Sequence, residues 1–170
     1  MKVLNSIINK FEEVVVIISL AVATTLTFIE VILRKFFGSS LGFTHELVVY
    51  LLITAGLIGA AIGVREKVHL GVDIVIQQFP LGLQKTIVIV TQIASVLFCL
   101  IITILGVQQV QNIAEFGQVT PEMEIPFFIP LLIVPISFGL MTLRFTQQLI
   151  QIMRTPAKGL LQEEEDAVHE

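Results

Sequence analysis

The chain has 170 residues, of which 55% are hydrophobic and only 14% are charged, and its formal net charge is −4. A soluble domain carries about 25% charged residues, so this composition indicates an integral membrane protein. The negative net charge and the scattered basic residues argue against a nucleic-acid partner, and a single cysteine, Cys99, excludes an internal disulfide and a cysteine-based metal cluster.

Four uncharged runs take up about half of the chain, and each is long enough or nearly long enough to cross a bilayer. The runs are Val14–Ile29, Leu47–Val64, Thr86–Ala114 and Ile125–Leu143. In hydrocarbon every backbone polar group must be paired within the protein, and the runs lack the alternation of barrel strands, so they are predicted to be helices. The expected fold is an all-α membrane protein. Its transmembrane domain is placed at residues 1–154, with spans at about 12–34, 45–65, 85–109 and 125–150.

The basic residues predict the orientation, because lysine and arginine accumulate in cytoplasmic segments. If the N-terminus is cytoplasmic, the outer segments hold only two basic residues, Arg34 and Lys35. The cytoplasmic segments then hold Lys2, Lys10, Arg65, Lys67, Lys85, Arg154 and Lys158. We predict a multi-pass membrane protein with both termini in the cytoplasm. Arg144, near the end of the fourth span, is expected to snorkel to the cytoplasmic interface.

The first span carries one carboxylate, Glu30, near its outer end. Arg34 follows one turn later on the same face, so an ion pair is expected. A second interpretation makes Glu30 the proton-coupling carboxylate of a self-sufficient four-helix cation exporter, since an acidic residue inside a membrane helix marks a functional site by default. The place of Glu30 near the interface and beside Arg34 favours the ion pair.

The second span begins with polar residues and continues with small ones. Thr44 is a candidate N-cap, which places Glu46 in the first turn, near unpaired N–H groups and the positive end of the helix dipole. Gly56, Gly59 and Gly63 lie on or near one face, and small residues let helix backbones approach closely in lipid. This face is expected to pack against the first or third span, or against a partner protein.

The segment at about 66–79 is too polar to span the membrane. Its polar residues recur every three to four positions, with apolar residues on the other side, which is typical of an amphipathic helix lying in the membrane plane. The alternation from Val68 to Ile74 is also compatible with a strand, but an isolated strand would leave its edges unpaired. We therefore predict an in-plane helix between the second and third spans, followed by Pro80 and Gly82.

An acidic loop precedes the fourth span. Its charged residues are Glu115, Glu122 and Glu124. The loop is either simply solvated or a docking surface for a partner protein. Within the fourth span, Pro135 removes a backbone donor and is expected to bend the helix. The tail at 155–170 is acidic and is predicted to be a solvated cytoplasmic segment.

Enzymatic chemistry has little support in the sequence. The histidines His45, His69 and His169 form no pair facing across a helix bundle, and no Gly-rich phosphate loop or nucleophile elbow is present. A carrier needs polar groups near the midplane, where these spans offer only Ser, Thr and Gln. This scarcity of polar groups at the midplane points to an accessory subunit rather than a complete carrier. No catalytic residue, metal site or cofactor is expected in this chain.

One stretch of the chain resembles a known family pattern. Its residues are Glu46, Tyr50, the small-residue segment at 56–63, Arg65, His69, Asp73, Phe79 and Pro80. Their order resembles the DctQ-type small membrane subunit of tripartite ATP-independent periplasmic (TRAP) transporters, and the length, the four spans and the membrane-plane segment match over essentially the whole chain. Two departures are Thr54, where the family often has an aromatic residue, and the lack of any tryptophan.

The resemblance implies a set of partners. It makes the chain a small, non-catalytic scaffold subunit that packs, among membrane lipids, against a large polytopic permease subunit. That permease would hold the sodium and substrate sites of a sodium-coupled symporter. A periplasmic substrate-binding protein would deliver an organic acid of the sialic acid or C4-dicarboxylate class, with a lean toward sialic acid. The resemblance also implies a place in the bacterial inner membrane and makes the binding protein the partner that could dock on Glu115, Glu122 and Glu124.

The resemblance carries over Glu46, Arg65, His69 and Asp73 as motif positions without a catalytic role. Arg65, His69 and Asp73 are four residues apart, so one helix face can hold a ladder that contacts the partner, the lipid headgroups or its own members. We expect Asp73→Ala to weaken the complex without altering substrate selectivity. Transport assays on the purified complex check this, and a shifted selectivity in an intact complex would reject it.

Overall fold

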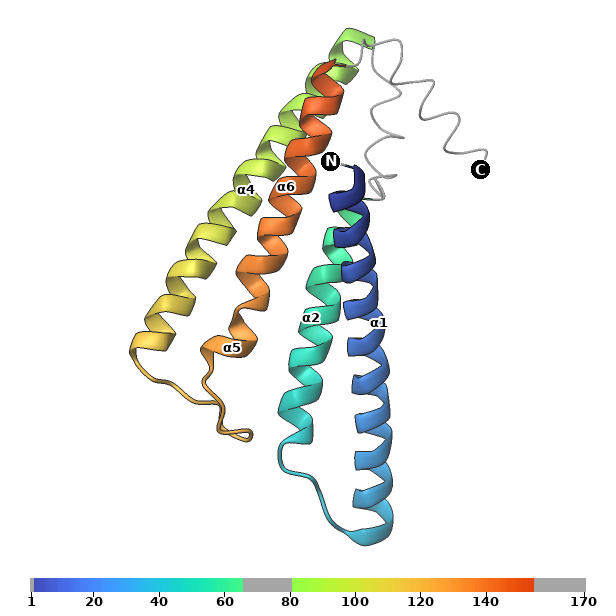
Figure 1. Cartoon of the computed structure of the whole chain (residues 1–170), viewed down its shortest axis with the longest axis vertical. Coiled ribbons are helices and arrows are strands. Elements are labelled where there is room, and N and C mark those ends of the chain that lie inside the picture. The colour runs from blue at the N-terminus through green and yellow to red at the C-terminus, as the bar shows by residue number, and fades with distance from the viewer. Residues whose placement is uncertain (1, 66–80, 155–170) are drawn as a thin grey trace, which may run out of the picture.

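The computed structural model describes residues 2–65 and 81–154, which are mostly helical (Figure 1). The helices are α1 (Lys2–Ile32), a π-helical turn η1 (Leu33–Phe37), α2 (Thr44–Arg65), α4 (Leu81–Glu115), α5 (Phe128–Leu131) and α6 (Ile133–Arg154). Within these residues, four stretches are long and apolar enough to cross a membrane: Ile8–Phe37, Thr44–Arg65, Lys85–Glu115 and Phe128–Met153. The prediction of an all-α membrane protein with four such helices is confirmed. The predicted in-plane helix and acidic tail lie outside the described residues.

The helices form two antiparallel hairpins, α1 with α2 and α4 with α6, which meet where α2 packs against α6 (Figure 1). One end of the molecule, here called the N-terminal end, holds the start of α1 and the last turns of α2 and α6. The opposite end, the loop end, holds the connections at 38–43 and 116–127. The hairpins diverge toward the loop end in Figure 1, so the two helix pairs do not close into a compact four-helix bundle.

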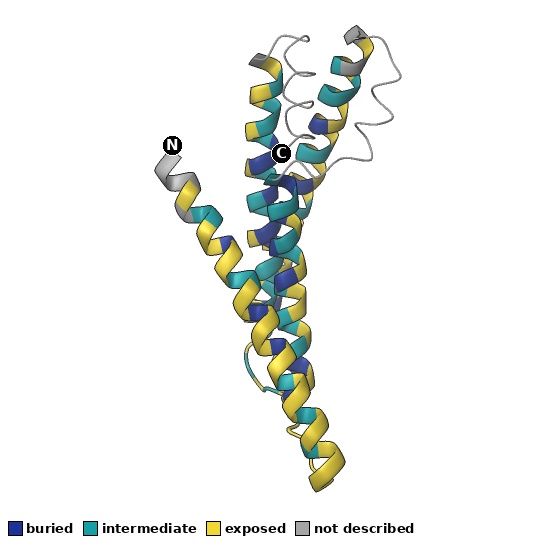
Figure 2. Ribbon diagram, turned by 90° about the vertical axis from the view of Figure 1, so that its right-hand side faces the viewer, coloured by how far each residue is buried: buried dark blue, intermediate teal, exposed yellow. Residues whose placement is uncertain are grey.

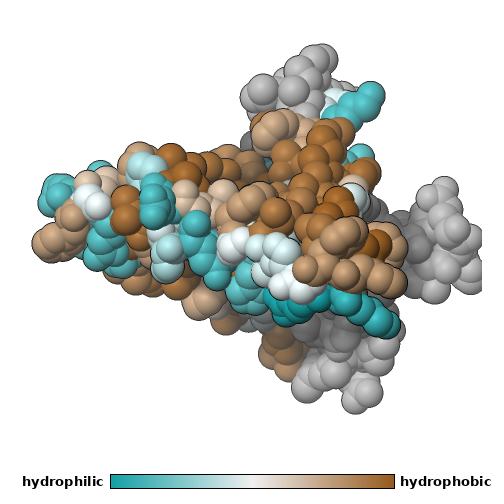
Figure 3. All heavy atoms as spheres, turned by 90° about the horizontal axis from the view of Figure 1, so that it is seen from below, coloured by the Kyte–Doolittle hydropathy of each residue, from teal (hydrophilic) through white to brown (hydrophobic). Residues whose placement is uncertain are grey.

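The apolar core is small and lies where α2, α4 and α6 meet. Its buried members are Ala61, Val64, Cys99, Met141 and Phe145. Figure 2 shows buried residues along the crossing helices and exposed residues over most of α1. Figure 3, viewed from the loop end, shows apolar side chains over much of the visible surface. Because packing inside the chain covers so little of this apolar surface, lipid or a partner protein must cover the rest.

The hairpin of α4 and α6 is built around a close approach between Gly106 and Pro135. A Cβ atom added to Gly106 would lie 3.4 Å from Cβ of Pro135, so a larger residue there would push the helices apart. Pro135 has no N–H to donate to the carbonyl of Leu131, the last residue of α5, and the helix is interrupted at Leu132 before α6 begins. The interruption agrees with the bend expected from this proline.

Candidate functional site

A buried ion pair lies between the hairpins toward the N-terminal end. Glu12 of α1 is fully buried, and Arg144 of α6 is only 6% exposed. Nη2 of Arg144 lies 3.3 Å from Oε1 and 3.4 Å from Oε2 of Glu12, and it also donates to the amide oxygen of Asn9. The expectation that Arg144 snorkels to the interface is therefore wrong. The arginine turns inward because a carboxylate faces it from α1, and pairing inside the protein is favoured over reaching for the headgroups.

Further polar contacts extend this ion pair to the other two long helices. Nη2 of Arg65 donates to Oε1 of Glu13 at 2.8 Å, and its Nη1 lies 3.8 Å from Oε2 of Glu12, which ties the end of α2 to α1. On α4, Nε2 of Gln92 donates at 3.0 Å both to the carbonyl oxygen of Phe145 and to Oε1 of Gln148. Gln148 in turn donates to the carbonyl of Val64. We call the set Asn9, Glu12, Glu13, Arg65, Gln92, Arg144 and Gln148 the polar junction.

At the loop end, Glu46 fastens the acidic loop to the start of α2. Its Oε2 accepts hydrogen bonds from the backbone N–H groups of Glu122 at 2.8 Å and Met123 at 2.9 Å. Its Oε1 accepts from the hydroxyl of Tyr50 at 2.6 Å. In return, Oε2 of Glu122 accepts from the backbone N–H of Glu46 at 3.1 Å. We call these contacts the loop clasp, and they bring together two motif residues, Glu46 and Tyr50, with one residue of the predicted docking loop.

The first residue of α2 does not cap its helix as expected. Thr44 is 2% exposed, and its hydroxyl oxygen is buried with no hydrogen-bond partner among the described residues. A first-turn N–H of α2 is instead satisfied by the carboxylate of Glu122, from 76 residues along the chain. A carboxylate is a stronger acceptor than a hydroxyl and suits the positive end of the helix dipole, so it takes this role once the loop folds against α2.

The acidic loop is folded on itself around Thr120. The backbone N–H of Thr120 donates to the carbonyl oxygen of Ile125 at 2.8 Å, and the Thr120 hydroxyl accepts from the N–H of Ile125 at 3.2 Å. Glu124 holds φ of 52°, a left-handed conformation that non-glycine residues adopt uncommonly. The side chains of Glu115 and Glu124 are exposed. The loop therefore presents carboxylates from a defined backbone, and its docking role stays a prediction.

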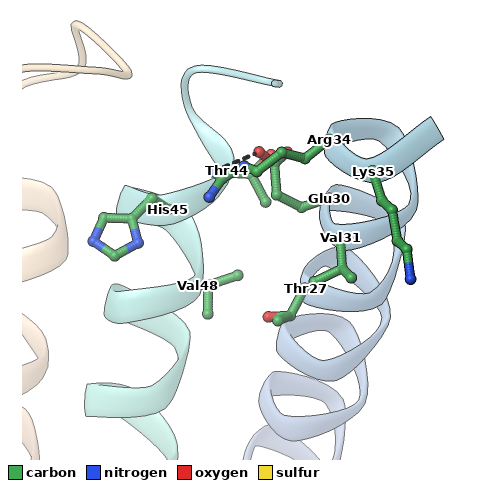
Figure 4. Close-up of a pocket in the computed structure, with 8 residues that line it drawn as sticks. All are labelled: Thr27, Glu30, Val31, Arg34, Lys35, Thr44, His45 and Val48. Carbon is green, nitrogen blue, oxygen red and sulfur yellow. Dashed lines mark hydrogen bonds and ion pairs between the residues drawn. The ribbon is translucent and has the colours of Figure 1, made fainter. Parts of the chain in front are cut away.

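The expected ion pair between Glu30 and Arg34 is confirmed. Nη2 of Arg34 lies 3.2 Å from Oε1 of Glu30 (Figure 4). The same carboxylate also accepts from the hydroxyl of Ser40 and, at 3.1 Å, from the backbone N–H of Leu41. Glu30 thus holds the connection between α1 and α2 against the end of α1, which is a structural role and gives no support to the exporter interpretation.

The glycine face of α2, formed by Gly56, Gly59 and Gly63, is open. A Cβ atom added at any of the three would meet no other atom within 4 Å in the described part of the chain. Ala61 and Val64, on another face of α2, join the core with residues of α4 and α6. The expectation that the glycines pack against the first or third span is therefore wrong. The alternative, contact with a partner protein, is compatible with this open face.

Sequence reasoning missed the polar junction, although the charges that form it are visible in the chain. Glu12 and Arg144 are opposite charges at the edges of apolar spans, and such charges are expected to pair within the protein. The motif residues His69 and Asp73 lie outside the described residues, so their ladder with Arg65 stays a prediction. Among residues 2–65 and 81–154, no group of three or more potential ligands that could hold a metal ion is present.

Comparison with known proteins adds independent information. A sequence model of the family described as tripartite ATP-independent periplasmic transporters, DctQ component, matches residues 23–155. The chain is 30% identical over 118 residues to the C4-dicarboxylate TRAP transporter small permease protein DctQ of Rhodobacter capsulatus, covering 69% of this chain and 52% of that protein. It is 26% identical over 167 residues to the protein of the same name from Vibrio cholerae, covering 85% of this chain and 72% of that protein.

A longer relative also matches. The chain is 23% identical over 106 residues to the isethionate TRAP transporter permease protein DctMQ of Oleidesulfovibrio alaskensis, covering 62% of this chain. The matched region makes up only 17% of that protein. The similarity to the Rhodobacter capsulatus protein likewise spans about half of that protein's length.

Proposed function

Because the chain belongs to the DctQ component family of tripartite ATP-independent periplasmic transporters, we propose that it is the small, non-catalytic scaffold subunit of a membrane importer. The transporter is a sodium-coupled symporter for an organic acid of the C4-dicarboxylate or sialic acid class. A large polytopic permease holds the sodium and substrate sites, and a periplasmic binding protein delivers the substrate. The family match over residues 23–155 is the observation that carries this proposal.

The use of the buried polar groups supports a scaffold role. A carrier needs polar or charged side chains that face a pathway near the midplane. The buried charges Glu12 and Arg144 are paired with each other, and Gln92 and Gln148 bond between helices. Groups held in this way keep the helices in register rather than meeting a transported solute.

The glycine face of α2 is the surface that we assign to the large permease. In lipid, helix association is driven by close packing rather than by hydrophobicity, and small residues permit the closest approach. This face is open, as shown above: among the described residues, nothing lies within 4 Å of a Cβ atom added at any of the three glycines. A relative named as the permease protein DctMQ contains the matched region within a much longer chain, which supports a permanent association with a large permease.

Gly59→Leu should weaken association with the large permease about tenfold or more, because overpacking a close helix contact costs roughly 1–3 kcal/mol. The isolated chain should stay folded, since leucine has a higher helix propensity than glycine and the position is open. The amount of permease that co-purifies with the tagged chain measures the effect. Ala94→Leu adds bulk to an exposed position of α4 and serves as the control. Equal recovery of permease with both variants would place the interface elsewhere.

The subunit assignment itself is tested by tagging the chain, solubilising native membranes gently and identifying what co-purifies. We expect a large polytopic permease at equal stoichiometry. Proteoliposomes containing both chains should then take up the organic acid in response to a sodium gradient when the binding protein is present. Recovery of a homo-oligomer without a permease would overturn the scaffold role and make Glu30 the first residue to test for transport.

The orientation belongs to the same proposal. With both termini in the cytoplasm of a bacterial inner membrane, the loop end faces the periplasm. The exposed carboxylates of Glu115 and Glu124 then lie on the side from which a binding protein approaches. Complementary charge accelerates encounters between proteins and gives them specificity, which is the role proposed for this loop.

A further inference from the structure

A groove runs between α1 and α2 at the loop end. The part nearest the loop end has a volume of about 520 Å³. It is lined by residues of α1, η1 and α2, among them Glu30, Arg34 and Thr44 (Figure 4). A second hollow of about 410 Å³ continues along the same two helices. Thr27, Val31 and Val48 line both parts, so they form one continuous space, here called the α1–α2 groove. Each part falls within the roughly 300–1,000 Å³ of small-molecule sites.

The polarity of the groove changes along its length. The deeper part lies between the spans and is lined by apolar side chains such as Ala23, Phe28 and Leu52. The mouth lies where the helices end and carries the polar groups of Glu30, Arg34 and Thr44. The polarity of a phospholipid in a bilayer changes in the same direction, with apolar acyl chains in the interior and a charged phosphate at the level of the helix ends.

The mouth offers hydrogen-bond donors that the fold does not use fully. The Arg34 side chain is 71% exposed, and Figure 4 shows it extending from η1, the turn that follows α1, toward α2. A guanidinium has five N–H donors, and the ion pair with Glu30 engages one nitrogen, Nη2. Thr44 lines the same mouth, and its buried hydroxyl has no partner among the described residues. A buried hydroxyl without a partner is destabilising, so its presence here indicates a group supplied from outside the chain.

The charged residues that line the mouth also favour binding of a negatively charged phosphate. Of the described residues that line the mouth, Glu30 is the one acid, and its carboxylate already accepts from Arg34, Ser40 and Leu41. Arg34 and Lys35 both contribute to the lining, so the basic groups outnumber the acidic one. In Figure 4 the Lys35 and His45 side chains point away from the space between the helices, which leaves Arg34 as the cation placed to contact a ligand.

We propose that the α1–α2 groove binds a membrane phospholipid. One acyl chain fills the apolar depth between α1 and α2. The phosphate accepts hydrogen bonds from the exposed Arg34 guanidinium and lies beside the Thr44 hydroxyl, which is closed to solvent. The bound lipid then forms part of the wall between the two helices at the loop end. A transported solute or a soluble ligand does not fit this order of polarity, because the deeper lining is apolar and lies within the membrane spans.

The test uses the full-length chain purified in detergent and offered phosphatidylglycerol, phosphatidylethanolamine or diacylglycerol with identical acyl chains. Native mass spectrometry counts the lipid that each protein retains. We expect one phospholipid of either headgroup to be retained and diacylglycerol to be lost, since diacylglycerol lacks the phosphate. Arg34→Gln should lower phospholipid retention about fivefold, the effect of one basic residue at a membrane surface. Lys10→Gln removes an exposed charge at the other end of the molecule and should leave retention unchanged.

A second pair of variants tests the groove without changing charge. Val48→Phe fills the shared part of the groove and should abolish retention, whereas Val49→Phe adds the same bulk to an exposed neighbour and should not. Equal retention of diacylglycerol, or no difference between Val48→Phe and Val49→Phe, would overturn the proposal. A cysteine cross-link from position 48 to the large permease, with no lipid retained, would also overturn it and assign the groove to a protein helix.

Discussion

Arg144→Met should destabilise the chain by up to about 3–5 kcal/mol, because removing one partner of a buried ion pair leaves the other charge buried, here with only the more distant Arg65 guanidinium at 3.8 Å as a partner. Glu12 is fully buried, and the Arg144 guanidinium is its closest cation, at 3.3 Å compared with 3.8 Å for Arg65. The free energy of unfolding of the full chain in mixed micelles measures the loss.

Two further variants separate the buried pair from ion pairs in general. Arg34→Met makes the same substitution in a pair whose arginine is 71% exposed, and it should cost less than about 1 kcal/mol. The double variant Glu12→Met with Arg144→Met should recover most of the lost stability, since apolar residues of similar volume often replace a buried pair without cost. Equal losses for Arg144→Met and Arg34→Met would show that Glu12 is not held as the structure describes.

Glu46→Ala should release the acidic loop from α2. The substitution removes the acceptor for the N–H groups of Glu122 and Met123 and for the hydroxyl of Tyr50. Hydrogen bonds to a charged group contribute about 1.5–3 kcal/mol, which corresponds to roughly tenfold to hundredfold faster amide exchange at the two loop residues. Hydrogen exchange of the full chain, read at Glu122 and Met123, is the measurement.

The controls for the loop clasp come from the same region. Glu46→Gln keeps one carbonyl acceptor and should give an intermediate exchange rate. Glu115→Ala removes an exposed carboxylate at the end of α4 and should leave the exchange of Glu122 and Met123 unchanged. Unaltered exchange in Glu46→Ala would contradict the clasp. Under the proposed docking role, Glu46→Ala also lowers uptake while the large permease stays bound through the glycine face.

The features that sequence reasoning predicted correctly are those decided within one helix. Long uncharged runs become spans because lipid leaves no other way to pair the backbone, whatever the neighbouring helices do. The ion pair between Glu30 and Arg34 depends only on a spacing of four residues along one helix. The bend near Pro135 follows from a missing donor in the same helix.

The features that sequence reasoning missed depend on which helices pack against each other. Arg144 was expected at the interface because nothing in its own helix shows that Glu12 faces it from α1. Thr44 was expected to cap α2, whereas the acceptor arrives from Glu122 in a distant loop. The glycine face was expected to be covered, but α2 turns its other face toward the core. Each outcome needs the packing of whole helices, which the local pattern does not specify.

The buried ion pair also sets an order of events during synthesis. Glu12 and Arg144 are 132 residues apart, so the ribosome needs roughly 7–26 s at 5–20 residues per second between making the first and the second. Throughout this interval the first helix must enter the membrane with a carboxylate whose final partner does not yet exist. Arg65 emerges much earlier and lies within ion-pair distance of Glu12, so it is the available temporary counter-ion. Completion of the fourth helix is therefore the step at which the nascent chain can form its final buried ion pair.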